Sequence, residues 1–239
     1  MGLLDFPAPF LSWLDDWLTG FLPPLAKLIL WAGVGAILSM ALYRLLSPQH
    51  QIAALKRVLV RAQQRVAEYD GELSGAWPLI GRMLSLAVRR VALVLPATLL
   101  ASLPLLAFIV WLDGAYGSVF PPPGEPAQIE VRGDYHGEWI EGSGGPPLAR
   151  VVNGNGEPVV DVPLAAPVST VHKRRWWNAL IGNPAGYLPA DAPIDDIRIA
   201  MHRQQFLSVG PDWLRGWEAI FFPALILFAL TFKAVWRIE

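Results

Sequence analysis

The hydrophobic pattern divides the chain into three long apolar runs and two intervening stretches of different periodicity. The apolar runs cover residues 24–46, 91–112 and 216–233. Each is close to the roughly 20 residues that a helix needs to cross the core of a bilayer. The second run is free of charge, whereas the first has Lys27 near one end and Arg44 near the other. The pattern therefore predicts three transmembrane helices.

The stretch between the first two apolar runs, residues 47–90, has a helical period. Apolar residues recur at steps of three and four through Ile52, Leu55, Leu59, Ala62, Val66 and Tyr69, and then mainly at such steps through Leu73, Trp77, Ile80 and Leu84. Asp70-Gly71 separates the two series. This spacing places each series on one face of a helix and predicts an antiparallel helical hairpin of the coiled-coil type. A single kinked helix that packs on its own chain is the alternative.

The residues before the first run, 1–23, contain a shorter amphipathic pattern. Residues 8–22 alternate bulky apolar side chains with Ser12, Asp15, Asp16 and Thr19. Such a segment is typical of a helix that lies in the membrane–water boundary, with tryptophan at the level of the headgroups. Pro23-Pro24 would then form the bend into the first transmembrane helix.

Loop charge predicts the orientation of these segments. Residues 1–23 contain no Lys or Arg, whereas residues 47–90 carry seven basic residues. Because cytoplasmic loops are enriched in Lys and Arg, we expect the hairpin and the tail at 234–239 in the cytoplasm and the N-terminus outside. The acidic start of the chain and the length of the first run also argue against a cleaved signal peptide.

Residues 113–215 change character and predict a separate β-domain on the outer side. Short β-favouring runs, bounded by Gly and Pro, occupy residues 128–132, 138–141, 149–153, 158–162, 169–173 and 194–202. Residues 153–156, Asn-Gly-Asn-Gly, are a strong hairpin signal between two of them. Five or six short strands in such a length predict a small antiparallel sandwich or barrel. The expected fold class is thus an α-helical membrane protein with three transmembrane helices, a cytosolic hairpin and this outer domain.

Composition excludes several classes of function. A hydrophobic content of 54% with 16% charged residues is too apolar for an ordinary soluble protein, and a net charge of −1 provides no basic footprint for DNA. The absence of cysteine excludes disulfides and thiolate metal sites. The frequent Ala, Leu, Arg, Pro and Trp residues suggest a GC-rich bacterial source, so the expected location is the inner membrane.

The chain shows no recognisable catalytic or cofactor-binding motif. The four histidines are scattered without a metal-ligand spacing, and neither GxSxG nor a P-loop occurs. We therefore expect a protein that is not an enzyme and needs neither a metal nor another cofactor. Its expected partners are the lipid bilayer and other membrane proteins, as clients or as subunits of a hetero-oligomer.

Polar residues inside the predicted transmembrane helices are the first candidate functional group: Arg44, Ser39, Thr98 and Ser102. Arg44 could face a water-filled groove, or it could extend to the nearby headgroups. The hydroxyls and the small residues around Gly33 and Gly35 fit either a polar recess or close helix packing, which is the commoner reason for small residues.

Two basic clusters are the other candidates. The cytosolic hairpin carries Lys56, Arg57, Arg61 and Arg65 on its surface. The outer domain contains the run Lys173, Arg174, Arg175, Trp176 and Trp177. The outer run fits a patch that binds lipid headgroups, since basic side chains meet phosphates and tryptophan enters the interface. The ordinary alternative is a strand end with both tryptophans packed beneath it.

The order of these elements resembles the YidC/Oxa/Alb insertase superfamily. Residues 8–22, 24–46, 48–90, 91–112 and 217–232 take the places of its outer amphipathic helix, first span, cytosolic hairpin and two later spans. The resemblance implies an insertase-like protein, or a membrane chaperone or assembly factor, that uses a groove between its helices. Residues 113–215 depart from the pattern, because members usually join these spans by something much shorter. The alternative is a non-enzymatic subunit of a larger envelope complex, with the β-domain as a binding module.

Overall fold

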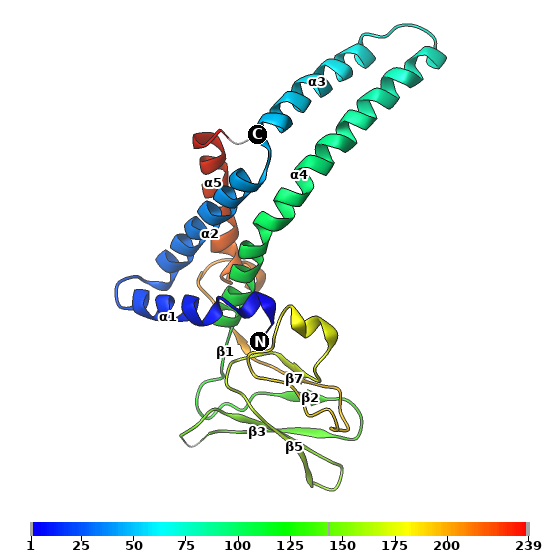
Figure 1. Cartoon of the computed structure of the whole chain (residues 1–239). Helices are drawn as coiled ribbons and strands as arrows, with labels where there is room; N and C mark the ends of the chain where they lie inside the picture. Colours follow the sequence, from blue (N-terminus) through cyan, green and yellow to red (C-terminus); the bar gives the residue numbers. More distant parts are fainter. Residues whose placement is uncertain (1, 143, 238–239) are drawn as a thin grey trace. The chain divides into compact units, whose positions relative to one another are not determined.

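The computed structural model describes residues 2–142 and 144–237, which form five α-helices, three short 3-10 helices and eight short strands (Figure 1). The helices are α1 (Ala8–Thr19), α2 (Pro24–Leu46), α3 (Gln49–Ala67), α4 (Leu73–Tyr116) and α5 (Glu218–Val235). The chain forms two compact units. Unit 1 comprises Met1–Leu30 and Leu106–Phe222, and unit 2 comprises Trp31–Leu105 and Pro223–Glu239.

Helices α2, α4 and α5 are long and apolar enough to cross a membrane. The structure corrects one expectation, because the second arm of the hairpin and the apolar run 91–112 form one uninterrupted helix, α4, of 44 residues. Arg89 and Arg90 at the expected boundary are good helix formers, and neither glycine nor a capping residue interrupts the chain there. At 1.5 Å per residue α4 is ~66 Å long, about twice the thickness of a bilayer core.

Small residues of α2 allow close contact between the helices of unit 2. A Cβ atom placed on Gly33 would lie 3.5 Å from the ring of Phe228 in α5. One placed on Gly35 would lie 3.5 Å from Leu105 in α4 and 3.8 Å from Leu225 in α5. The glycines of α2 therefore serve helix packing, the commoner of the two expected roles.

Helices α3 and α4 form two arms that run in opposite directions, joined by residues 68–72 (Figure 1). The interruption falls at Asp70-Gly71, where the pattern predicted it. Ile52 and Leu59 are buried, and they belong to the apolar series that the helical period places on one face of α3. The stretch is thus a pair of helices rather than a single kinked helix.

The β-domain of unit 1 contains a strand at each of the six predicted places and two more at its ends. The strands are β1 (Ser118–Val119), β2 (Ile129–Val131), β3 (His136–Ile140), β4 (Leu148–Val152), β5 (Pro158–Pro163), β6 (Thr170–His172), β7 (Asp196–Ile199) and β8 (His202–Arg203). They pair antiparallel in the orders β1-β8, β2-β7-β6 and β3-β4-β5.

The hairpin predicted at residues 153–156 joins β4 to β5. The side-chain oxygen of Asn153 accepts hydrogen bonds from the backbone N–H of Asn155 at 3.0 Å and of Glu157 at 2.9 Å. Gly156 has a φ of +79°, a conformation that glycine adopts without strain. The turn chemistry of this short run therefore sets the register of the two strands.

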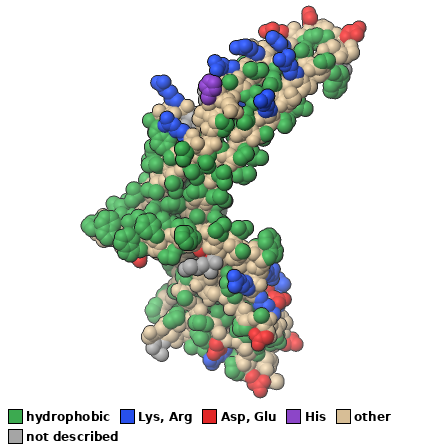
Figure 2. Space-filling view, in the orientation of Figure 1, with side chains coloured by type: hydrophobic (Ala, Val, Ile, Leu, Met, Phe, Trp, Pro, Cys, Tyr) green, Lys and Arg blue, Asp and Glu red, His purple; other side chains and the backbone are tan. Residues whose placement is uncertain are grey.

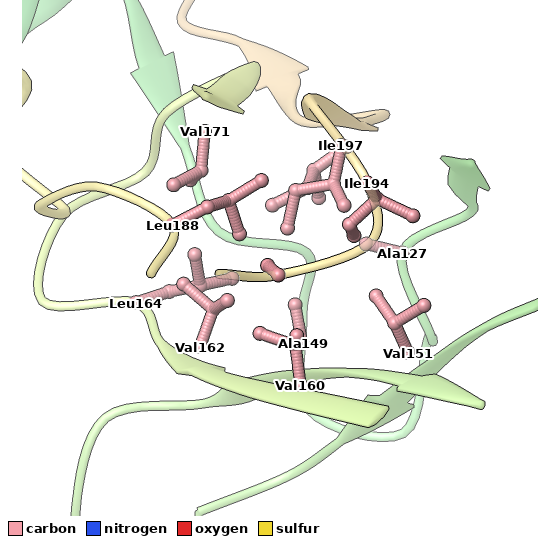
Figure 3. Packing of buried hydrophobic residues seen from close by; sticks show 12 residues of the cluster. Ala127, Ala149, Val151, Val160, Val162, Leu164, Val171, Leu188, Ile194 and Ile197 are labelled. Atoms are coloured by element: carbon pink, nitrogen blue, oxygen red, sulfur yellow. The ribbon is translucent and has the colours of Figure 1, made fainter. Parts of the chain in front are cut away.

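Two three-stranded sheets contribute to the core of the β-domain (Figure 3). Ala149, Val151 and Val160 come from the β3-β4-β5 sheet, and Val171 and Ile197 come from the other sheet. Buried residues alternate with less buried ones along β5 and β7 and over most of β4, as expected where one face of each sheet is covered. Of the two expected architectures, the paired sheets have the layered form of a sandwich.

Candidate functional site

An exposed apolar stripe runs along α4 through unit 2. Its members share one helical face at steps of three, four or seven residues: Trp77, Leu84, Val88, Val91, Leu95 and Leu99. The opposite side of α4 carries the buried residues Ala97 and Ala101. The stripe is therefore the outward face of the helix, and it continues from the hairpin arm into the charge-free run without a break.

The hairpin part of the stripe carries large apolar side chains. Trp77, Leu84 and Val88 are 64%, 59% and 60% exposed. They lie on the N-terminal side of Arg89 and Arg90, outside the run that is long enough to fill a bilayer core. Contiguous exposed apolar surface of this kind marks contact with a partner or with a membrane.

The predicted basic residues of the hairpin, Lys56, Arg57, Arg61 and Arg65, are all exposed on α3. Figure 2 shows Lys and Arg side chains gathered over this part of the molecule. Within the described residues, none of the three arginines forms an ion pair, and the acidic residues of the hairpin are confined to positions 68–72. The three arginines thus present positive charge that no described acidic side chain pairs.

The hydroxyls predicted to line a groove bond to backbone carbonyls. Ser39 of α2 donates to the carbonyl oxygen of Ala101 in α4 at 3.1 Å. Thr98 donates to Val94 at 3.0 Å and Ser102 donates to Leu99 at 2.8 Å, both within α4. Ser39 therefore joins α2 to α4 at Ala101. The hydroxyls of Thr98 and Ser102 instead bond to carbonyls of the preceding turn in their own helix.

Arg44 lies in the last turn of α2 and its side chain is exposed. Among the described residues it makes neither a hydrogen bond nor an ion pair, so the structure does not bring it together with the three hydroxyls. Its position allows the guanidinium to reach a headgroup region or an approaching acidic group.

In unit 1, α1 has the amphipathic character expected of residues 8–22, with an outward face of aromatic rings. Phe6, Phe10, Trp13, Trp17 and Phe21 follow one another at steps of three or four and are all more than half exposed. A row of exposed Phe and Trp side chains suits the boundary between headgroups and acyl chains.

The inward face of α1 carries a buried ion pair that sequence reasoning missed. The Lys27 ammonium donates to Asp15 at 2.7 Å and to the Thr19 hydroxyl at 3.0 Å. Tyr116, at the end of α4, donates its hydroxyl to the second Asp15 oxygen at 2.5 Å, and its ring centroid lies 5.4 Å from the ammonium. Lys27 is only 5% exposed, so these bonds offset the cost of burying its charge.

The sequence contains one feature that could have indicated the Lys27–Asp15 pair. The Pro23-Pro24 turn reverses direction between α1 and α2, which brings a charge twelve positions before Lys27 back toward it. The third partner, Tyr116, is 101 residues from Asp15, and no local pattern could have indicated it.

The outer basic run lies around the 3-10 helix η2 (Trp176–Ala179). Trp176 is 84% exposed, and Arg174 and Arg175 are exposed as well. Lys173 forms an ion pair with Asp195 at 3.3 Å, and the Trp177 ring packs against His172 in a tilted arrangement with ring centroids 4.8 Å apart. Trp176 is therefore not packed beneath the strand, whereas Trp177 is partly covered.

Within the described part of the chain, no group of three or more His, Asp or Glu side chains could hold a metal ion. The candidate functional surfaces are the stripe of α4, the basic arm of α3 and the aromatic face of α1. No known family model, curated protein or solved structure matches the chain.

Proposed function

We propose that the chain is an insertase-like membrane protein, or a membrane chaperone or assembly factor, of the bacterial inner membrane. The observation that carries the proposal is the continuous exposed stripe of α4 beside the basic arm of α3. An apolar client segment could bind Trp77, Leu84 and Val88 and then move along the same helix face toward the bilayer.

The orientation follows from charge. Seven basic residues at 47–90 favour a cytosolic hairpin, and the N-terminal stretch without Lys or Arg favours an external start. The client would then arrive from the cytosol, where the arginines of α3 attract acidic residues that flank its apolar segment. The β-domain would lie outside, and Lys233 and Arg237 of the tail would lie inside.

The direct experiment is reconstitution of the full chain in liposomes with a client that has one apolar segment and a short translocated tail. We expect the protein to raise the protease-protected fraction of the client. A variant with Trp77→Ser, Leu84→Ser and Val88→Ser should lose most of this gain, because the cytosolic part of the stripe becomes polar. Ser85→Ala, at an exposed position beside the stripe, is the matched control and should retain it.

Arg44→Ala provides a second comparison in the same assay. We expect a partial loss, because Arg44 is the only basic residue near the cytosolic end of α2. Insertion no higher than in empty liposomes, with wild type and all variants alike, would overturn the insertase proposal. A defined complex recovered in mild detergent together with that result would favour the alternative, a non-enzymatic complex subunit.

A further inference from the structure

A cleft of about 930 Å³ lies within unit 1, a volume in the range of small-molecule sites. Three segments and one further residue form it: residues 5–12, residues 109–118, residues 167–184 and Trp217. Its apolar wall includes Pro9 of α1, Ile109 and Val110 of α4, and Trp177 of η2. The wall from α4 belongs to a helix that is apolar enough to cross a membrane, so an acyl chain could enter beside it.

Several polar groups line the cleft without a hydrogen-bond partner among the described residues, although Arg203 and Glu218 act electrostatically on Asp113. The side chain of Asp113 accepts no hydrogen bond, and the hydroxyls of Ser118, Ser169 and Thr170 make none. Trp217 is 3% exposed, and its indole N–H is buried without an acceptor. Because this N–H is itself inaccessible, the polar groups that can meet a ligand in the cleft are the Asp113 carboxylate and the three hydroxyls.

The charge of the cleft selects the ligand. Asp5 and Asp113 line it, whereas no Lys or Arg does. Asp5 is held in place by the backbone N–H groups of Gly2 and Gly182, at 2.7 and 2.8 Å from one carboxylate oxygen. His172 also lines the cleft, and its Nδ1–H donates to the Lys173 carbonyl at 2.6 Å. A ligand with a cationic group and acceptor oxygens is therefore favoured over a simple anion.

We propose that this cleft binds one phospholipid with a primary-amine headgroup. The ammonium lies at Asp113, with Asp5 adding negative potential. The phosphate and ester oxygens accept from the hydroxyls of Ser118, Ser169 and Thr170. One acyl chain covers the apolar wall of α4. The proposal rests on the membrane placement given under Proposed function but does not need insertase activity.

Native mass spectrometry of the full chain in mild detergent tests the proposal. The purified protein is delipidated and titrated with phosphatidylethanolamine, phosphatidylcholine and phosphatidylglycerol of the same acyl chains. We expect one tight site, with the ethanolamine lipid bound about tenfold more strongly than the choline lipid, whose quaternary ammonium cannot donate hydrogen bonds to Asp113.

Two variants and one control complete the design. Asp113→Asn should abolish the preference for the amine, and Ser169→Trp should fill the cleft and remove the tight site while leaving the charge unchanged. Asp134→Asn, at an exposed aspartate remote from the lining, should behave as wild type. Circular dichroism and thermal unfolding identify a variant that fails to fold, in which case the other variant decides.

Equal binding of the three lipids, or an unchanged preference in Asp113→Asn, would overturn the proposal. So would displacement of the lipid by a basic peptide with higher affinity, because the cleft would then be a peptide site. The liposome insertion assay is independent of these readouts. If the wild-type protein inserts the client but binds the three lipids equally, this proposal alone is overturned. If it prefers the ethanolamine lipid but does not insert the client, the insertase proposal alone is overturned.

Discussion

The two units of the molecule differ in how many of their charged side chains form ion pairs. In unit 1, several charged side chains are paired, such as Lys27–Asp15, Arg150–Asp161 and Arg203–Glu218, although Arg174 and Arg175 remain exposed. In unit 2, the arginines at 57, 61 and 65 have no acidic partner within the described residues. Charges that are consumed internally stabilise a structure, whereas charges left open on an exposed helix are available to a partner. We therefore expect the ion pairs of unit 1 to contribute to stability, and we propose that the three arginines of unit 2 contact a partner.

The largest expected effect is the loss of stability when one charge of the buried Lys27–Asp15 pair is removed. Lys27→Met should destabilise the full chain by about 3–5 kcal/mol, because Asp15 is then buried without its counter-charge. Thermal unfolding in detergent, followed by tryptophan fluorescence, measures the loss. The double variant Asp15→Leu, Lys27→Met should recover part of it, since no unpaired charge remains. Equal stability of wild type and Lys27→Met would contradict the structural role of the pair.

Neutralising the three unpaired arginines of unit 2 should leave the stability nearly unchanged and weaken the binding of a client. The variant Arg57→Gln, Arg61→Gln, Arg65→Gln should keep its stability within about 0.5 kcal/mol, as exposed substitutions usually do. Its affinity for an acidic client segment should fall roughly tenfold, given about 0.2–1 kcal/mol for each lost surface pair. Fluorescence titration with a labelled client measures the affinity, and Gln51→Ala, Gln63→Ala, Gln64→Ala on the same helix is the control. A stability loss as large as that of Lys27→Met would show that the three arginines also stabilise the fold, which would contradict the difference between the units.

The smallest expected effect is the stability contributed by the exposed Asp161–Arg150 ion pair and its dependence on pH. The hydrogen bond from Arg150 lowers the pKa of Asp161 below its ordinary value of 3.8. Stabilisation by this carboxylate is therefore complete above the ordinary pKa and is lost as the pH falls through the lower folded value. The difference in melting temperature between wild type and Asp161→Asn should be small at neutral pH and should vanish in strong acid. A difference that grows on acidification would show that the sign is wrong.

Local patterns predicted much of this fold. The apolar run at 24–46 coincides with α2, the six β-favouring runs all contain strands, and Asp70-Gly71 separates α3 from α4. These features depend on residues close together in the chain, where period and turn chemistry decide the conformation. The pattern does not predict the continuity of α4, because the change from a charged to an apolar surface suggests a helix boundary although the helix propensity of the residues does not change there.

The sites depended on contacts that local patterns do not encode. Ser39, Thr98 and Ser102 were recognisable as polar residues in apolar helices, but their carbonyl partners follow from the packing and the backbone. Tyr116 meets Asp15 across 101 residues, and the cleft combines residues from the start of α1 to Trp217. Only the folded unit brings such groups together.

The most direct test of the account is site-specific photo-crosslinking along α4 during client insertion. A photoreactive residue at position 77, 84 or 88 should crosslink to the apolar segment of the client, and positions 91, 95 and 99 should crosslink later in the reaction. Position 82, which is exposed and lies at least about 100° around the helix from every member of the stripe, should give little product. Equal crosslinking at position 82 and on the stripe, or crosslinks to lipid alone at every position, would contradict a role for the stripe in guiding clients.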